Sequence, residues 1–169
     1  MKKIIEQNNF FDIIRNTIKE GECIVEIGAG IGETTIELLK IAKEKKCRVY
    51  VIDPFDNEMP PSYVYNYAQF LDKVKDYKEN YILLKNTSLS KVAEGLLEGM
   101  NIGFVFIDGL QYRGAILNDL RITEHAKIVC LDDFNRESLT SEVPSTLNMY
   151  MKTSTKQLII KERWAYLIK

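Results

Sequence analysis

A glycine-rich segment with an acidic residue in front of it stands near the N-terminus. Glu26–Gly32 reads EIGAGIG, so glycine occupies every second position from Gly28 onward. Glycines at alternate positions let the backbone turn sharply and let a ligand lie against it with no Cβ in the way. Asp53 follows Gly28 by 25 residues, where a carboxylate can accept hydrogen bonds from vicinal ribose hydroxyls. Together these features indicate a nucleoside-containing ligand; a merely tight loop and an Asp that caps a turn are the alternatives.

The spacing of the three glycines separates two classes of nucleoside cofactor. A dinucleotide-binding loop reads G-x-G-x-x-G, whereas Gly28, Gly30 and Gly32 read G-x-G-x-G. With Glu26 two positions before the first glycine, the segment resembles motif I of the class I S-adenosylmethionine-dependent methyltransferases. S-adenosylmethionine carries a sulfonium and an ammonium group but no phosphate, so a carboxylate beside the loop attracts it. An NAD(P)-dependent oxidoreductase and a non-catalytic cofactor- or partner-binding module of the same fold are the alternatives.

The resemblance implies a cofactor site built from the ends of several strands. The ribose acid of the family falls on Asp53, and its adenine-contacting segment falls on Asn86–Ser88. An acidic residue is common in the family where this chain has Thr87. Ser88 is equally well explained as the N-terminal cap of the following helix. The residues expected to bind the cofactor are Glu26, Gly28, Ala29, Gly30, Gly32, Asp53, Pro54, Asn86, Thr87, Ser88 and Asp108.

A second resemblance concerns the methyl acceptor. Phe106–Tyr112 reads FIDGLQY and is similar to the FIDG-x-H-x-Y segment of small-molecule O-methyltransferases. Gln111 stands where many of these enzymes have a histidine, and Tyr112 follows one residue early. A histidine base is therefore not expected here. The resemblance implies catalytic roles for Asp108 and Gln111 in methyl transfer to a small-molecule substrate, at a hydroxyl oxygen.

Three acidic residues, Asp108, Asp132 and Asp133, follow the fourth and fifth predicted strands. The carboxyl ends of parallel strands lie at one edge of a sheet, where ligands bind in such folds. Magnesium takes a few carboxylate oxygens and keeps several waters. The catechol-type and macrocin-type O-methyltransferases, which the chain resembles, use acids at these places, and this implies a magnesium site of Asp108, Asp132 and Asp133. Alternatively, Asp132 and Asp133 solvate a loop, and Asp108 faces the methionyl end of the cofactor.

Several other residues invite a functional interpretation. His125 is the only histidine, but it lies before the fifth predicted strand, away from the residues above. A surface position is therefore expected for it. Tyr63, Tyr65 and Tyr67 follow Asp53 and are candidates for a lid over the cofactor, with helix packing as an equal explanation.

The elements that must position these residues alternate between helix-like and strand-like segments, which is typical of an α/β fold. Five apolar runs of strand length predict a parallel sheet covered on both faces. The last two strands must pair antiparallel, because a parallel crossover takes a dozen or more residues. We expect a Rossmann-like, doubly wound seven-stranded sheet with helices on both faces. The predicted strands are Cys23–Ile27, Arg48–Ile52, Tyr81–Leu84, Ile102–Ile107, Ile128–Leu131, Lys156–Lys161 and Trp164–Lys169, and the predicted helices are 8–20, Glu33–Lys45, one ending near Asp76, Ser90–Leu97, Ala115–Glu124 and Ser145–Met151.

Length and charge set the remaining expectations. A chain of 169 residues with 46% hydrophobic residues suits one domain over residues 1–169, with the helix 8–20 ahead of the core. With 23 basic and 24 acidic residues, a net charge of -1 offers nothing to attract nucleic acid, and no apolar run suits a membrane span. Cys23, Cys47 and Cys130 lack metal-binding spacing and are interpreted as buried, reduced thiols, as in a cytoplasmic protein. Whether the protein is a monomer or a homodimer stays open.

Overall fold

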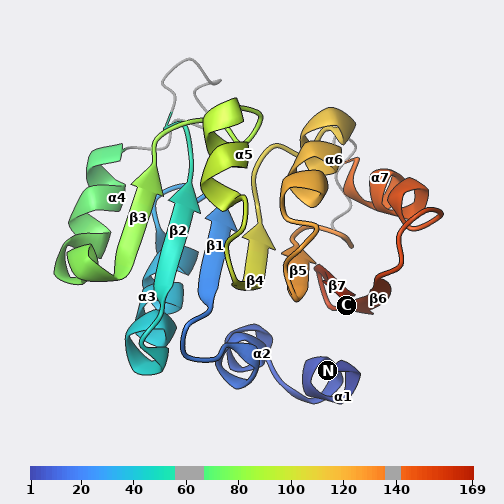
Figure 1. Ribbon diagram of the computed structural model, residues 1–169, viewed down its shortest axis with the longest axis horizontal. Coiled ribbons are helices and arrows are strands. Elements are labelled where there is room, and N and C mark those ends of the chain that lie inside the picture. Colours follow the sequence, from blue (N-terminus) through green and yellow to red (C-terminus); the bar gives the residue numbers. More distant parts are fainter. Residues whose placement is uncertain (56–66, 136–141) are drawn as a thin grey trace.

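A seven-stranded mixed sheet forms the centre of the computed structural model, in the order β3-β2-β1-β4-β5-β7-β6 (Figure 1). The structure describes residues 1–55, 67–135 and 142–169. Strands β1 to β5 run parallel, and β7 pairs antiparallel with both β5 and β6. This confirms the predicted sheet of parallel strands with a C-terminal antiparallel pair. The strands are β1 (Cys23–Ile27), β2 (Arg48–Ile52), β3 (Tyr81–Leu84), β4 (Ile102–Ile107), β5 (Ile128–Leu131), β6 (Gln157–Lys161) and β7 (Trp164–Ile168).

Helices cover both faces of this sheet. One face packs against α2, α3 and α4, and the other packs against α5, α6 and α7 (Figure 1). A short 3-10 segment, η2, follows α4 and leads into β3. The helical elements are α1 (Lys2–Gln7), α2 (Phe10–Thr17), α3 (Glu33–Lys45), α4 (Tyr67–Val74), η2 (Lys75–Asn80), α5 (Lys91–Leu97), α6 (Arg113–Ile122) and α7 (Val143–Tyr150).

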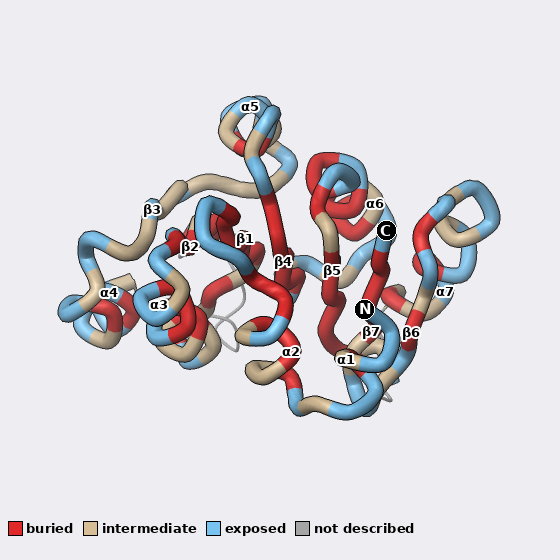
Figure 2. Tube along the Cα trace, turned by 60° about the horizontal axis from the view of Figure 1, so that its bottom comes forward, coloured by how far each residue is buried: buried red, intermediate tan, exposed pale blue. Residues whose placement is uncertain are grey.

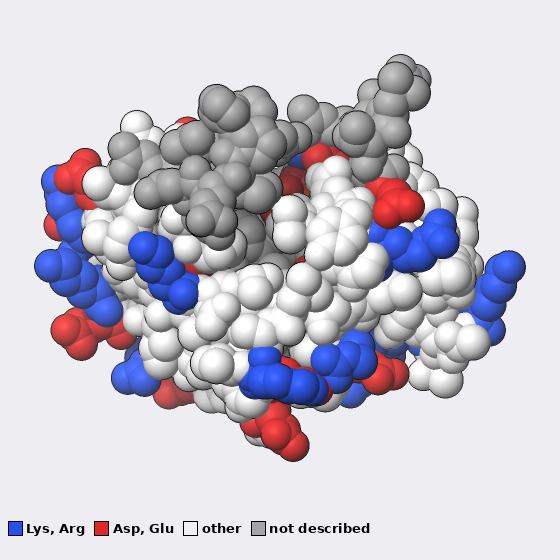
Figure 3. Space-filling model, turned by 90° about the horizontal axis from the view of Figure 1, so that it is seen from above, with Lys and Arg blue, Asp and Glu red and all other residues white. Residues whose placement is uncertain are grey.

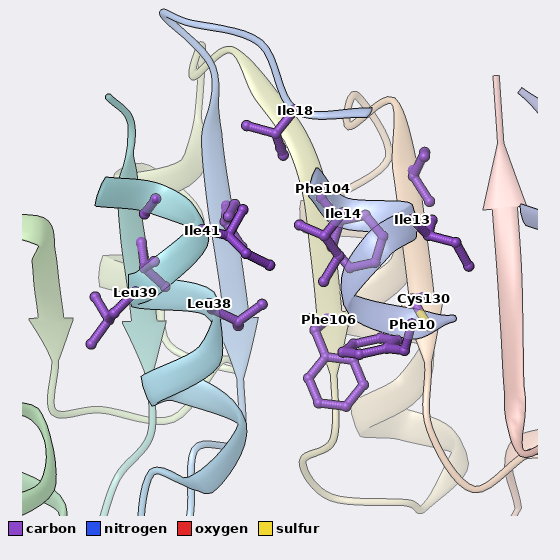
Figure 4. Packing of buried hydrophobic residues seen from close by; sticks show 14 of the residues in the cluster. Phe10, Ile13, Ile14, Ile18, Leu38, Leu39, Ile41, Phe104, Phe106 and Cys130 are labelled. Atoms are coloured by element: carbon purple, nitrogen blue, oxygen red, sulfur yellow. The ribbon is translucent and has the colours of Figure 1, made fainter. Parts of the chain in front are cut away.

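Successive residues of the central strands belong to two different cores. Ile24 of β1 packs in the core shared with α2 and α3, whereas Val25 packs in the core shared with α5 and α6. Because both faces are covered, every residue of β1, β4 and β5 is buried (Figure 2). This explains why these strands read as continuous apolar runs in the sequence. Figure 4 shows the first core, in which Phe104 and Phe106 of β4 lie against side chains of α2.

The N-terminal segment forms two short helices instead of the single helix predicted over 8–20. Asn8 has an extended backbone (φ -120°, ψ 153°), which separates α1 from α2. Asn9 then begins α2, because its side-chain oxygen accepts the backbone N–H of Asp12 at 2.9 Å. Phe10 anchors α2 to the sheet by stacking on Trp164, with 4.9 Å between the ring centroids. Asn8 and Asn9 therefore interrupt the helix, although the apolar side chains of this segment recur at helical spacing.

Other boundaries differ from the prediction by one or two residues: the end of α4, the start of α5, both ends of α6 and α7, the start of β6 and the end of β7. The helix expected to end near Asp76 ends two residues earlier and continues as η2, because Tyr77 has a non-helical backbone (φ -122°, ψ 21°). Helix α5 begins after Ser90, whose hydroxyl accepts the backbone N–H of Ala93 at 3.1 Å. Ser88, which was the predicted alternative cap, lies two residues too early for that role.

The carboxyl ends of β1 to β5 lie at one edge of the sheet, the upper edge in Figure 1. The turns that carry the predicted site residues therefore gather at this edge. His125 precedes β5 at the opposite edge and is exposed, as expected. Cys23, Cys47 and Cys130 are buried and free of disulfides, also as expected. Within the described ranges, no helix combines the length and the hydropathy that a membrane span requires.

Candidate functional site

The turn after β1 packs directly on the turn after β4. Gly28 adopts a left-handed backbone (φ 87°), and its N–H donates to the carbonyl oxygen of Ile52 at 2.9 Å. A Cβ at this position would lie 2.4 Å from the carbonyl oxygen of Asp108. Any side chain would therefore push the two turns apart, so the first glycine of the motif is required by both its backbone angles and its surroundings.

Asp53 shapes the glycine loop through its carboxylate. Its Oδ2 atom accepts the backbone N–H groups of Ala29 (2.7 Å) and Gly30 (3.1 Å), and its Oδ1 atom accepts that of Phe55 (2.7 Å). Asp53 is buried, whereas the neighbouring Pro54 is exposed. Asp53 therefore caps the turn that follows β2 and fixes the loop after β1. A carboxylate offers about four lone-pair positions, so three N–H donors leave acceptor capacity for a ligand hydroxyl.

Glu26 is fully buried behind the same loop. Its Oε2 atom accepts the hydroxyl of Thr35 at 2.6 Å, and its Oε1 atom has no hydrogen-bond partner within the described residues. Burial raises the pKa of Glu26 to about 8; the Thr35 hydrogen bond opposes this, and the charges of Asp108 and Asp53 raise it further. The carboxyl group is therefore protonated at neutral pH unless a cation lies beside it.

The turn after β3 lies at the same edge. The side-chain oxygen of Asn86 accepts the backbone N–H of Thr87 (2.8 Å), and the Thr87 hydroxyl accepts that of Leu89 (3.3 Å). The carbonyl oxygen of Ser88 accepts the side-chain amide of Asn118 in α6 at 2.9 Å. These contacts fix the shape of the turn. A further hydrogen bond, from the N–H of Asp53 to the carbonyl oxygen of Leu84, places the turn next to the end of β2.

On the other side of the glycine loop, the predicted catalytic residues lie in the turn between β4 and α6. Asp108 is exposed, and its N–H donates to the carbonyl oxygen of Ile27 at 2.8 Å. The side-chain amide of Gln111 donates to Oδ2 of Asp133 at 2.7 Å. The structure thus brings Gln111 together with an acid from the end of β5. Because a histidine is absent from this position, the contact is a fixed amide–carboxylate hydrogen bond.

The magnesium site predicted at Asp108, Asp132 and Asp133 is not supported. Arg163, in the turn between β6 and β7, donates from Nε to Oδ1 of Asp132 (2.6 Å) and from Nη2 to Oδ2 of Asp132 (2.7 Å). The same Nη2 donates to Oδ1 of Asp133 at 2.5 Å. These oxygens therefore already have a cationic partner. Among the described residues, no three His, Cys, Asp or Glu side chains are arranged to hold an ion.

Arg163 was not predicted from the sequence. It follows Glu162, whose left-handed backbone (φ 56°) makes the tight turn between the last two strands. Since β7 runs antiparallel to β5, the residue before β7 stands at the carboxyl end of β5. The sequence predicts that the last two strands pair antiparallel, but it does not predict that β7 pairs with β5. Only that second pairing places Arg163 at the carboxyl end of β5.

The tyrosines proposed as a lid are only partly visible. Tyr63 and Tyr65 lie outside the described residues. Tyr67 begins α4, and its ring packs on Phe55 with 5.0 Å between centroids, while the ammonium of Lys85 lies 4.5 Å from the Tyr67 ring centroid. Helix packing therefore accounts for Tyr67.

Seen from the carboxyl edge, the surface is hollowed near its centre, and acidic atoms are visible there (Figure 3). Glu26, Asp53 and Asp108 lie close enough for the latter two charges to raise the pKa of the first. Acids thus gather around a glycine loop whose N–H groups at Ala29 and Gly30 are held by Asp53. Such a site suits a ligand that carries positive charge and hydroxyl groups.

Comparisons with known proteins agree with this geometry. A profile of the family described as methyltransferase domain matches residues 25–131. No curated protein matches the chain. The fold is similar to that of an rRNA methylase from Streptococcus thermophilus, at 15% identity over 94% of this chain and 93% of that chain (TM-score 0.60). It is also similar to SMU.1697c from Streptococcus mutans in complex with SAH, at 14% identity over 100% and 99% of the two chains (TM-score 0.63), and to the O-methyltransferase NovP, at 14% identity over 93% and 74% (TM-score 0.65).

The matched residues run from β1 to the end of β5 and include the glycine loop, Asp53 and Asp108. The match covers more than half of the sequence, and the solved structures named above share the fold at TM-scores of 0.60 to 0.65. The chain therefore belongs to the methyltransferase domain family.

Proposed function

We propose that the protein transfers a methyl group from S-adenosylmethionine to a hydroxyl oxygen of a small molecule. The observation that supports this most directly is the group of acids around the glycine loop, Glu26, Asp53 and Asp108. The charges of Asp53 and Asp108 attract a ligand with sulfonium and ammonium groups and repel the pyrophosphate of a dinucleotide, and Glu26 becomes charged when a cation lies beside it. The acids therefore favour S-adenosylmethionine over NAD(P).

Each part of the cofactor has a candidate partner in the chain. Glu26 offers the buried Oε1 atom, which lacks a partner among the described residues, to the ammonium group. Asp53 is held in place by loop N–H groups and keeps acceptor capacity for the ribose hydroxyls. Asn86–Ser88, in the adjacent turn, is assigned to the adenine end. The bound cofactor supplies an electrophilic methyl group, so the protein has to align and enclose it.

Gln111 is assigned to the acceptor. Its side-chain nitrogen is held by Asp133, and its Oε1 atom can accept a hydrogen bond from a hydroxyl group of the acceptor. This orients a lone pair of the acceptor oxygen toward the methyl group; as the O–CH₃ bond forms and the S–CH₃ bond breaks, the hydroxyl proton is released to water. No step is assigned to magnesium, because Asp132 and Asp133 are paired with Arg163.

A small molecule is favoured over RNA by the charge of the molecule. The net charge is -1, and basic residues are spread around the rim of the candidate face instead of forming one patch (Figure 3). RNA binding depends strongly on clustered Lys and Arg that neutralise phosphates. The titles of the similar structures name both rRNA methylases and an O-methyltransferase, so the acceptor requires its own experiment.

Calorimetric titration with S-adenosylmethionine and with NAD tests the cofactor. We expect saturable heat with S-adenosylmethionine and none with NAD. Asp53→Asn should weaken binding by about tenfold, because the loop N–H groups and the ribose lose a charged acceptor. Glu98→Gln, an exposed acid at the end of α5, serves as the matched control and should bind like the parent protein. Heat with NAD alone would replace the methyltransferase assignment by the oxidoreductase alternative.

Methyl-labelled cofactor tests the acceptor. The protein is incubated with hydroxylated metabolites in one series and with ribosomal RNA in another. Label in a metabolite, with no label in RNA, is the expected result. Label in RNA alone would refute the small-molecule part of the proposal. Cofactor binding without transfer to either class would favour a non-catalytic module.

A further inference from the structure

Arg163 occupies an unusual position between two buried carboxylates. The side chains of Asp132 and Asp133 are 7% and 4% exposed, whereas that of Arg163 is 49% exposed. Three N–H···O contacts of 2.5 to 2.7 Å join the guanidinium to the two acids. The inner edge of the guanidinium therefore neutralises the pair, and its outer part reaches solvent.

The backbone at Asp132 and Asp133 turns both carboxylates toward Arg163; these three residues are called the arginine cluster below. Asp133 has a left-handed backbone (φ 57°), which is uncommon for a residue with a side chain and has a free-energy cost of about 1–3 kcal/mol. The Asp133 N–H donates to Oδ1 of Asp132 at 2.8 Å, and this turns the two carboxylates toward the same side. Adjacent carboxylates that face one side repel each other, so the arrangement needs a cation between them.

A cavity of about 410 Å³ opens beside the arginine cluster. It is lined by Asp133, Asn135, Glu162 and Arg163. The three contacts with the acids use Nε and Nη2 of Arg163, and no group among the described residues accepts a hydrogen bond from Nη1. Asp133 also holds Gln111, which links this cavity to the turn assigned to the acceptor.

We propose that the guanidinium of Arg163 is a resident cation that takes the place of a divalent metal at the end of β5. This inference rests on the proposed function only in assigning Gln111, which Asp133 holds, to the methyl acceptor. Magnesium binds proteins through one or two carboxylates and several waters, and Asp132 with Asp133 would supply those carboxylates. Arg163 fills that position with a fixed planar fork that cannot be removed by a chelator. The acceptor side of the site is therefore independent of metal ions.

Binding of Mn²⁺ as a paramagnetic probe tests the inference without cofactor or acceptor. The full chain is titrated with MnCl₂ and free Mn²⁺ is followed by electron paramagnetic resonance. We expect no saturable site in the parent protein, and a site at least about tenfold tighter in Arg163→Met, where both carboxylates are released. Adding Asp132→Asn to Arg163→Met should abolish that site. A saturable site in the parent protein that is lost in Asp132→Asn, or no gain of binding in Arg163→Met, would overturn the inference.

Thermal denaturation keeps the test decisive if Arg163→Met folds poorly. In that variant Mn²⁺ should raise the melting temperature, because the ion replaces the lost positive charge. Arg163→Lys retains a charge and should gain no Mn²⁺ site, which separates loss of the cation from loss of the side chain. An equal Mn²⁺ effect on the parent protein and on Arg163→Met would contradict the inference. Failure of S-adenosylmethionine to bind would refute the proposed function and leave these outcomes unchanged.

Discussion

The two halves of the candidate site stabilise their carboxylates in different ways. At the ends of β1 and β2, Asp53 accepts backbone N–H groups of the glycine loop and of its own turn. At the ends of β4 and β5, Asp132 and Asp133 are held by the side chains of Arg163 and Gln111. Backbone donors are present in any sequence that makes the loop, whereas a guanidinium depends on one residue. The first half therefore depends on the backbone of the loop, and the second half depends on the identity of single side chains.

Gly28→Ala tests the first half and should have the largest effect. The new Cβ would meet the Asp108 carbonyl oxygen at 2.4 Å on a left-handed backbone, so we expect about 3–5 kcal/mol of destabilisation. Urea denaturation measures the loss of unfolding free energy. Gly109→Ala is the matched control, since its Cβ would lie 3.5 Å from the nearest atom and should have an effect below about 1 kcal/mol. Equal effects of the two substitutions would contradict the required contact between the turns.

Glu26→Gln should change the pH dependence of stability. The pKa of Glu26 is raised to about 8 in the folded protein, so its stabilising contribution is present at low pH and is lost as pH rises toward 8. Relative to Glu26→Gln, the parent protein should lose about 3 kcal/mol between about pH 5 and pH 8, since one pKa unit corresponds to 1.36 kcal/mol. Urea denaturation of both proteins across this pH range provides the difference. Parallel curves would show that the buried carboxyl does not hold its proton.

Asp132→Asn probes the second half and should have a smaller effect. It removes one charge from the pair with Arg163 and retains the shape of the side chain. Because Arg163 is half exposed and can be rehydrated, we expect about 2 kcal/mol of destabilisation. Lys91→Met, which removes an exposed partner of Glu94 in α5, is the control and should change stability by less than about 0.5 kcal/mol. Equal unfolding free energies of the two variants would show that the pair of Asp132 with Arg163 stabilises the protein no more than an exposed ion pair does.

The same contrast explains what could be predicted from the sequence. Glu33–Lys45 and Ile102–Ile107 were predicted with their observed bounds, because their periodicity is local and glycine or polar residues end them. The glycine loop and Asp53 were placed correctly at the carboxyl edge of the sheet for the same reason. The three backbone N–H groups that donate to the Asp53 carboxylate depend on the loop conformation, which residue types alone do not specify.

The errors lie where distant segments meet. Asp132 and Asp133 have the composition of a metal site, and only the folded chain brings Arg163, about 30 residues later, between them. The N-terminal helices depend on contacts with β6 and β7, where Lys161 donates to the carbonyl oxygens of Ile5 and Asn8 at 3.0 and 2.5 Å. Periodicity within one segment contains no information about such partners.

The position of β7 between β5 and β6 has a consequence for synthesis. When β6 leaves the ribosome, the strand that it pairs with in the described sheet has not yet been made. The edge of β5 is also uncovered until β7 arrives. A nascent chain thus passes through a stage with open strand edges, which are prone to pair with other chains.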